Sequence, residues 1–277
     1  MTRWTLSGFG DEIDPDPVVQ AAVLQALGAN RIEVRSAWGT NIVDLDDAQL
    51  DRLAGVLRDR GMGVSAIASP IGKVDVALPV EHEVRRLERA IRAAEVLEAP
   101  FIRIFSFFRS AERTPEDVRD EVLVRMAALA RTAEAARVTL VHENEKEIYG
   151  DTPDRVLDVI ESVGSDRLRA AWDNANFVQV GVRPFTDGYA LLRPHIAYLQ
   201  VKDAIAATGE VVPAGEGDGE LRETLTALRD DGYDGYASLE PHLTDYSALG
   251  GFSGSAAFGR AGRALRALTD EIGVTLS

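Results

Sequence analysis

Short apolar runs alternate with stretches of helical periodicity along the whole chain. The runs whose pattern predicts strands are 5–10, 31–36, 63–69, 101–108, 138–144, 168–174, 196–203 and 236–242. The stretches with an apolar residue at every third or fourth position are 16–27, 46–60, 81–97, 115–136, 153–163, 184–193, 219–231 and 256–272. Each predicted strand is therefore followed by a predicted helix.

Residues typical of helix ends support these boundaries. Thr114 and Thr152 each precede a proline, which is the usual order of an N-cap and a first helical residue. Gly28, Gly61 and Gly232 follow predicted helices directly, where a left-handed residue is favoured. The pattern predicts repeated strand–helix units.

Eight such units predict parallel strands joined by right-handed crossovers. A closed (β/α)₈ barrel has about 250 residues, and this chain has 277 without a linker or a break in composition. The rival is an open doubly wound sheet, which would carry a G-x-G-x-x-G turn after its first strand; the segment GFGDEI lacks that spacing. We therefore predict one α/β domain over residues 1–277, a single (β/α)₈ TIM barrel.

Composition narrows the class of protein. No run of 18 apolar residues is present, and the N-terminal segment turns acidic at once instead of forming a signal peptide. The absence of cysteine excludes disulfides and thiolate ligands. We expect a soluble, cytoplasmic protein that does not associate with membranes.

The formal net charge of −15 opposes nucleic-acid binding. One segment, 85–92, is rich in arginine, but Val84, Leu87, Ile91 and Ala94 around it form an apolar helical stripe. We therefore expect these arginines on the solvated face of a helix, and no nucleic-acid partner.

Polar side chains end the last four predicted strands. Because side chains alternate along a strand, the inward residues near these ends are Glu143, Asp173, Gln200 and Glu240. Convergent carboxylates repel one another unless a cation lies between them, and an all-oxygen set suits Mn²⁺ or Mg²⁺. The alternative is that each residue caps its strand or pairs with a Lys or Arg.

Eight motifs in order give the chain a resemblance to a known family. They are GFGDEI, IEVRSAWG, ASPIGKV, HENEKEIYGDTPD, AAWDNANFVQ, YLQVKDA, VVPAGEGDG and SLEPHL. Together they resemble the xylose isomerase-like TIM-barrel superfamily, often labelled sugar phosphate isomerases/epimerases, which also includes endonuclease IV. The resemblance implies a divalent cation held by Glu143, Asp173 and Glu240, with position 200 as the fourth ligand.

Position 200 departs from the family pattern, which has a histidine there. A Gln carbonyl oxygen suits hard cations better than softer ones, so we expect Mn²⁺ or Mg²⁺ and weakened zinc affinity. The departure also leaves open a metal-free member of the family.

The resemblance implies a metal-dependent isomerase or epimerase of a keto-sugar or cyclitol. Glu143 and Glu240 would move a proton α to a carbonyl through an enediolate. The alternatives are a lyase, such as an inosose dehydratase or an enzyme that eliminates from a 3-keto-glycoside, and a non-catalytic sugar-binding barrel. A nuclease like endonuclease IV needs a His-rich zinc site, which four histidines and a charge of −15 disfavour. Such barrels often form homodimers, although the residues hold no independent sign of one.

Further residues are candidates for the site. Lys202 lies on the same face as Gln200 and is a third catalytic candidate; its alternative is an ion pair with Asp203 or Glu240. The candidates for substrate contact are Arg35, Ser69, Lys73, Glu145, Asn176 and His242. Arg35 has a strand-end ion pair with Glu33 as its alternative.

Other side chains receive weaker assignments. Trp38, Phe107 and Phe108 are expected either as an apolar wall for a sugar or as core residues. His142 has the opposite parity to Glu143, so it is expected to pack rather than bind metal. No Arg cluster or phosphate cradle is evident in the sequence, and the Gly-rich segment 215–220 is acidic, so a phosphorylated substrate has no support at this stage.

Overall fold

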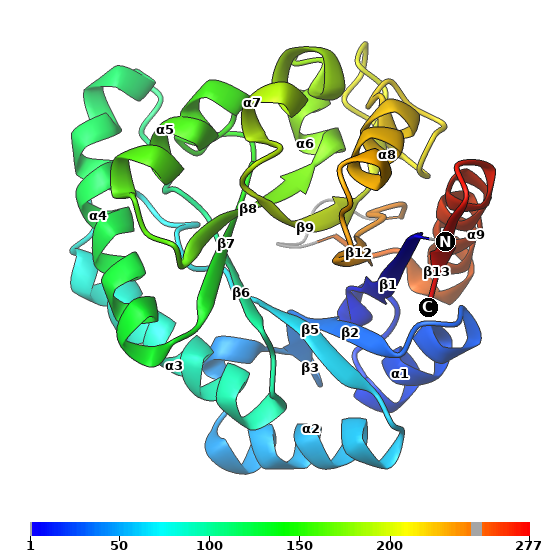
Figure 1. Cartoon of the computed structure of the whole chain (residues 1–277). Coiled ribbons are helices and arrows are strands. Elements are labelled where there is room, and N and C mark those ends of the chain that lie inside the picture. The colour runs from blue at the N-terminus through cyan, green and yellow to red at the C-terminus, as the bar shows by residue number, and fades with distance from the viewer. Residues whose placement is uncertain (1, 245–250) are drawn as a thin grey trace.

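The computed structural model describes residues 2–244 and 251–277, which form a curled parallel sheet enclosed by helices (Figure 1). The strands of the sheet are β1 (Thr2–Gly8), β2 (Arg31–Val34), β5 (Gly63–Ala68), β6 (Phe101–Ile104), β7 (Thr139–Glu143), β8 (Leu168–Asp173), β9 (Ile196–Val201), β12 (Tyr236–Leu239) and β13 (Val274–Leu276). Their order is β13-β1-β12-β9-β8-β7-β6-β5-β2, and every pairing is parallel. All eight predicted strands are confirmed.

The helices follow the predicted order around the sheet (Figure 1). They are α1 (Pro17–Ala26), α2 (Asp47–Asp59), α3 (Val80–Leu97), α4 (Pro115–Ala136), α5 (Pro153–Val163), α6 (Asn174–Gln179), α7 (Ala190–Leu192), α8 (Leu221–Asp230) and α9 (Gly254–Glu271). The helix predicted over 184–193 is instead a π-helical segment, η3 (Pro184–Tyr189), that runs into α7. The short helix α6 and the terminal strand β13 were not predicted.

Smaller elements lie beyond the ends of the strands. They are the 3₁₀ turns η1 (Gly10–Glu12) and η2 (Ile42–Asp44), the hairpin of β3 (Ser36–Ala37) with β4 (Thr40–Asn41), and the hairpin of β10 (Asp203–Ala204) with β11 (Val211–Val212). Periodicity does not detect such short pieces.

The sheet closes between β1 and β2. These strands stand next to each other although they share no continuous ladder, and a parallel bridge between Phe9 and Glu33 joins their ends. The closed sheet with its outer helices confirms the predicted TIM barrel.

The residues expected at helix ends occupy the predicted positions. Thr114 caps α4 in a capping box, and Thr152 is the N-cap of α5, although its side chain makes no capping hydrogen bond. Gly28, Gly61 and Gly232 have φ angles of +84°, +64° and +79°, a conformation that costs glycine little. Local chemistry therefore sets where these helices begin and end.

Two apolar layers fill the molecule. The interior of the barrel is packed by Ala66, Val141, Ala171 and Tyr198. A much larger layer lies between the strands and the outer helices. No helix in the described ranges combines the length and the apolar character needed to cross a membrane.

His142 lies on β7 with its side chain fully buried, which confirms its prediction as a packed residue. Neither ring nitrogen has a hydrogen-bond partner among the described residues. Burial lowers its pKa from 6.5 to about 3, so the ring is neutral in the folded protein. The unfolded chain binds a proton at His142 below pH 6.5, whereas the folded chain does not. This contribution to stability is therefore present above pH 6.5 and is lost as the pH falls toward 3.

We predict that His142→Leu makes the protein less sensitive to mild acid. Between pH 7 and pH 5 the His142 contribution falls by about 2 kcal/mol in the wild type, at about 1.4 kcal/mol per pH unit below 6.5. Urea unfolding of both proteins at the two pH values measures this difference. An identical loss of stability in both proteins would contradict the prediction.

Candidate active site

Three carboxylates meet at the carboxyl-terminal mouth of the barrel. Glu143 ends β7, Asp173 ends β8 and Glu240 follows β12. One oxygen of each lies within 4.8 Å of an oxygen of the others. All three side chains are buried. The inward parity expected from sequence is therefore what brings them together.

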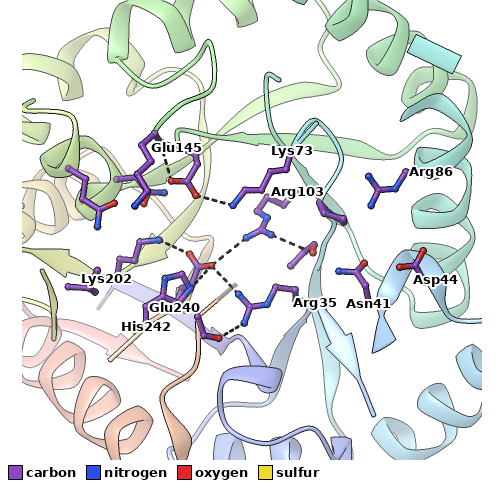
Figure 2. A pocket seen from close by; sticks show the side chains of 17 residues that line it. Arg35, Asn41, Asp44, Lys73, Arg86, Arg103, Glu145, Lys202, Glu240 and His242 are labelled. Atoms are coloured by element: carbon purple, nitrogen blue, oxygen red, sulfur yellow. Dashed lines mark hydrogen bonds and ion pairs between the residues drawn. The ribbon is translucent and has the colours of Figure 1, made fainter. Parts of the chain in front are cut away.

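Two protein cations lie among these carboxylates. Lys202 Nζ is 3.1 Å from Asp173 Oδ2 and 3.0 Å from Glu240 Oε2. Arg103 Nη1 is 3.0 Å from Glu143 Oε2 and 3.5 Å from Glu240 Oε1. Figure 2 shows Lys202 and Arg103 pointing at Glu240 from two sides. Buried charges need such partners, because desolvation of an unpaired carboxylate is costly.

The surroundings drive the pKa values of the two glutamates apart. Burial, followed by the nearby charge of Glu240, raises the pKa of Glu143. Burial also opposes ionisation of Glu240, but the neighbouring cations, led by Lys202, hold its pKa well below the ordinary value. A pair split in this way supplies one proton donor and one proton acceptor at neutral pH.

Gln200 stands in register with Asp173 on one side and Ser238 on the other. Its Nε2 donates to both carboxylate oxygens of Glu33, at 3.0 and 3.3 Å. Its Oε1 is buried and has no hydrogen-bond partner among the described residues. Glu33 therefore sets the orientation of the amide and leaves the oxygen of Gln200 free.

Two carboxylate oxygens of the site are held by ion pairs alone. Glu143 Oε2 is paired with Arg103 and Asp173 Oδ2 with Lys202, and neither accepts a further hydrogen bond of good geometry from the described residues. Together with Gln200 Oε1 they form a set of buried oxygens at neighbouring strand ends. Oxygen sets of this kind fit a hard divalent cation.

Asn176 on α6 orients two of the carboxylates. Its backbone N–H donates to Asp173 Oδ1, and its side-chain Nδ2 donates to Glu143 Oε1 at 3.1 Å. The short helix begins where β8 ends, so Asp173 serves as its N-cap. Asn176 also lines the cavity above the carboxylates.

Arg35 and His242 contact the outer side of Glu240. Arg35 Nη1 is 3.7 Å from Glu240 Oε1, and His242 Nε2 is 3.3 Å from the same oxygen. Arg35 Nε donates to Asp11 at 2.8 Å, so its strand-end partner is Asp11 and not Glu33. His242 Nε2 is also 3.2 Å from the buried Glu12.

A cavity of about 540 Å³ opens above this cluster, a volume typical of small-molecule sites. Its walls carry most of the predicted contact residues. The lining residues are Arg35, Asn41, Asp44, Ala68, Pro70, Lys73, Arg86, Arg103, Glu145, Lys146, Asn176, Gln179, Lys202, Val211, Glu240, His242 and Gly251.

Some predicted contacts lie elsewhere. Ser69 is fully buried and does not line this cavity; its hydroxyl donates to the backbone carbonyl of Arg103. Trp38, Phe107 and Phe108 are also absent from its walls. The structure thus gives Ser69 a part in bracing the end of β6.

Of the two alternative partners expected for Lys202, Glu240 forms the ion pair, whereas Asp203 is engaged elsewhere. Its carboxylate accepts the backbone N–H groups of Gly215, Gly217 and Gly219. The Gly-rich segment therefore wraps around an acidic side chain and does not form a phosphate cradle.

Arg103 is the main residue of the site that sequence reasoning missed. It lies on β6 in register with Val141, an inward residue of β7. Its guanidinium stacks over the rings of Phe9 and Phe105, with centroid distances of 5.1 and 4.7 Å. The parity that identified Glu143 would also have identified Arg103 had it been extended to the fourth strand.

Residues 21–268 match the family model of the xylose isomerase-like TIM barrel. The chain belongs to this family. A curated relative from Actinoplanes sp., a 2-epi-5-epi-valiolone 7-phosphate 2-epimerase, is 29% identical over 238 residues, which cover 83% of this chain and 81% of the relative.

Solved structures share the fold at lower identity. A D-tagatose 3-epimerase-like protein has a TM-score of 0.78 at 15% identity, over 97% of this chain and 98% of that one. A xylose isomerase-like TIM barrel protein from Mycobacterium smegmatis in complex with magnesium has a TM-score of 0.68 at 19% identity, over 98% of each chain. These matches support the fold described above.

Proposed function

We propose that this protein is a divalent-metal-dependent isomerase or epimerase of a keto-sugar or cyclitol. The observation that carries the proposal is the pair Glu143 and Glu240, buried at one barrel mouth with opposite pKa shifts beneath an open cavity. Membership of the family and the epimerase relative support the same reaction class.

In this mechanism Glu240 is the base. It is ionised, and it lines the cavity where a substrate carbon would lie. Glu143 holds a proton of its own and donates it to the opposite face of the same carbon, which gives epimerisation. Donation to the former carbonyl carbon, with the hydroxyl proton of the α-carbon passing to the former carbonyl oxygen, gives isomerisation. Lys202 and Arg103 stabilise the negative charge that develops on the substrate oxygen, because both face the cavity as fixed cations.

The residues fit a divalent cation. Asp173, Glu240 and the free oxygen of Gln200 would hold it, and Glu143 would join them in its ionised form; an all-oxygen set favours Mn²⁺ or Mg²⁺ over zinc. A cation bound there acidifies the proton α to a substrate carbonyl. A small-molecule substrate follows from the size of the cavity.

We predict exchange of the α-proton of a keto-sugar or inosose in deuterated water with Mn²⁺ present. Glu240→Gln and Glu143→Gln should each slow exchange by about 10²- to 10⁴-fold, since each removes a proton-transfer group. Glu88→Gln, an exposed glutamate on α3, is the matched control. NMR follows the exchange.

The products of the same assay separate the related reactions. Loss of a leaving group instead of exchange with retention would identify a lyase on this scaffold. No exchange with any compound of the panel, or an unchanged rate in Glu240→Gln, would refute the mechanism and favour a sugar-binding barrel.

We also predict that Mn²⁺ raises the melting temperature of the wild type and that Asp173→Asn weakens Mn²⁺ binding at least 10-fold. Asp44→Asn, which alters a lining acid outside the carboxylate cluster, should leave the Mn²⁺ affinity unchanged. Scanning calorimetry measures the melting temperature, and titration calorimetry with metal analysis measures Mn²⁺ binding. Zinc that stays bound through mild chelation would contradict the preference for a hard cation.

A further inference from the structure

The cavity is rich in positive charge for a chain that is strongly acidic. Six of its seventeen lining residues are Lys or Arg, against 30 among the 277 residues of the chain, whose net charge is −15. Three lining residues are acidic. The six basic ones are Arg35, Lys73, Arg86, Arg103, Lys146 and Lys202.

Lys146 is exposed, and the other five cations fall into two groups. Arg35, Arg103 and Lys202 all contact the central carboxylates. Lys73 and Arg86 stand on another wall, contributed by the turn after β5 and by α3. Figure 2 shows Arg86 at the side of the cavity away from Lys202. The second group therefore needs a separate explanation.

Glu83 connects the turn and the helix. It is buried, with one carboxylate oxygen accepting the N–H of Gly72 and the other 3.0 Å from Arg86 Nη1. Gly72 has a φ of +85°, and a Cβ there would lie 2.0 Å from the carbonyl oxygen of Phe105. The turn is thus held tightly, which places Lys73 and Arg86 on the wall before any ligand arrives.

Arg86 has donors to spare. Within the described part of the chain its one ion-pair partner is Glu83, which contacts Nη1 only, and the side chain is 26% exposed. Neutralising Glu83 does not by itself explain why the Arg86 side chain lines the cavity. Lys73 is 3.0 Å from Glu145 and lies over the ring of Phe105, which keep its ammonium in place.

We propose that the wall formed by Lys73 and Arg86 binds an anionic substituent of the substrate, a phosphate monoester or a carboxylate. This inference rests on the proposed function, with the reacting ketone at Glu143 and Glu240. A guanidinium binds an oxyanion through two parallel hydrogen bonds, and an ammonium that lines the same cavity adds attraction. The concentrated positive charge would also draw an anion past an acidic surface.

Calorimetric titration with four probes tests the proposal: inorganic phosphate, D-fructose, D-fructose 6-phosphate and D-fructuronate. The last three share a keto-sugar and differ at one carbon, so they separate phosphate from carboxylate. We expect wild type to bind the anions more tightly than D-fructose. Arg86→Met should weaken anion binding by about 10- to 100-fold, the loss expected for a hydrogen bond to a charged group.

Two further variants serve as controls. Arg85→Met removes the same charge from the adjacent, exposed position of α3 and should bind anions as the wild type does. Glu83→Gln/Arg86→Met leaves no unpaired buried charge and keeps an oxygen for the N–H of Gly72, so weakened binding there reports on the wall and not on misfolding.

Equal affinities of the wild type for D-fructose and all the anions, or equal anion affinities in wild type and Arg86→Met, would overturn the proposal. The titration requires no turnover. Anion selectivity without α-proton exchange would refute the proposed function alone, and exchange without anion selectivity would refute this inference alone.

Discussion

Three carboxylates buried at one end of the barrel require positive charge within a few ångströms, and the site is built around that requirement. Lys202 and Arg103 supply it from β9's end and from β6, on opposite sides of Glu240. Arg103 is itself held by the rings of Phe9 and Phe105. Charge compensation thus dictates which residues occupy the neighbouring strands.

A fourth buried carboxylate, that of Glu33, fixes Gln200. Burial raises the pKa of Glu33 to about 7, even though Ser238, Tyr198 and Gln200 all donate to its carboxylate. A histidine in place of Gln200 would offer one ring nitrogen to Glu33 and the other to a ligand. The amide divides these tasks between its nitrogen and its oxygen, and it presents the oxygen without titrating near neutral pH. An amide oxygen at this position fits a hard cation better than an imidazole nitrogen does.

Much of this arrangement follows from sequence periodicity, because the alternation of a strand is a strict rule. It predicted eight strands and the inward set of Glu143, Asp173 and Glu240. Arg103 was not predicted, because the inward parity was applied to the last four strands only. Arg86 escaped for a different reason: a helical stripe shows which face is buried, but not which flank of that face overlooks the barrel mouth. That depends on how α3 is tied to the turn after β5 through Glu83, a tertiary contact that local pattern does not contain.

The cavity that results is electrically uneven. At its base, three carboxylates are paired with Lys202, Arg103 and Arg35. On the wall, Lys73 forms an ion pair with Glu145. Arg86 forms an ion pair with the buried Glu83 and keeps free N–H donors. A substrate with an electron-rich carbonyl oxygen at one end and an oxyanion at the other would match both regions in one orientation only. Discrimination between the two ends of such a molecule would then come from charge placement, because reversing it would set the oxyanion against the carboxylates.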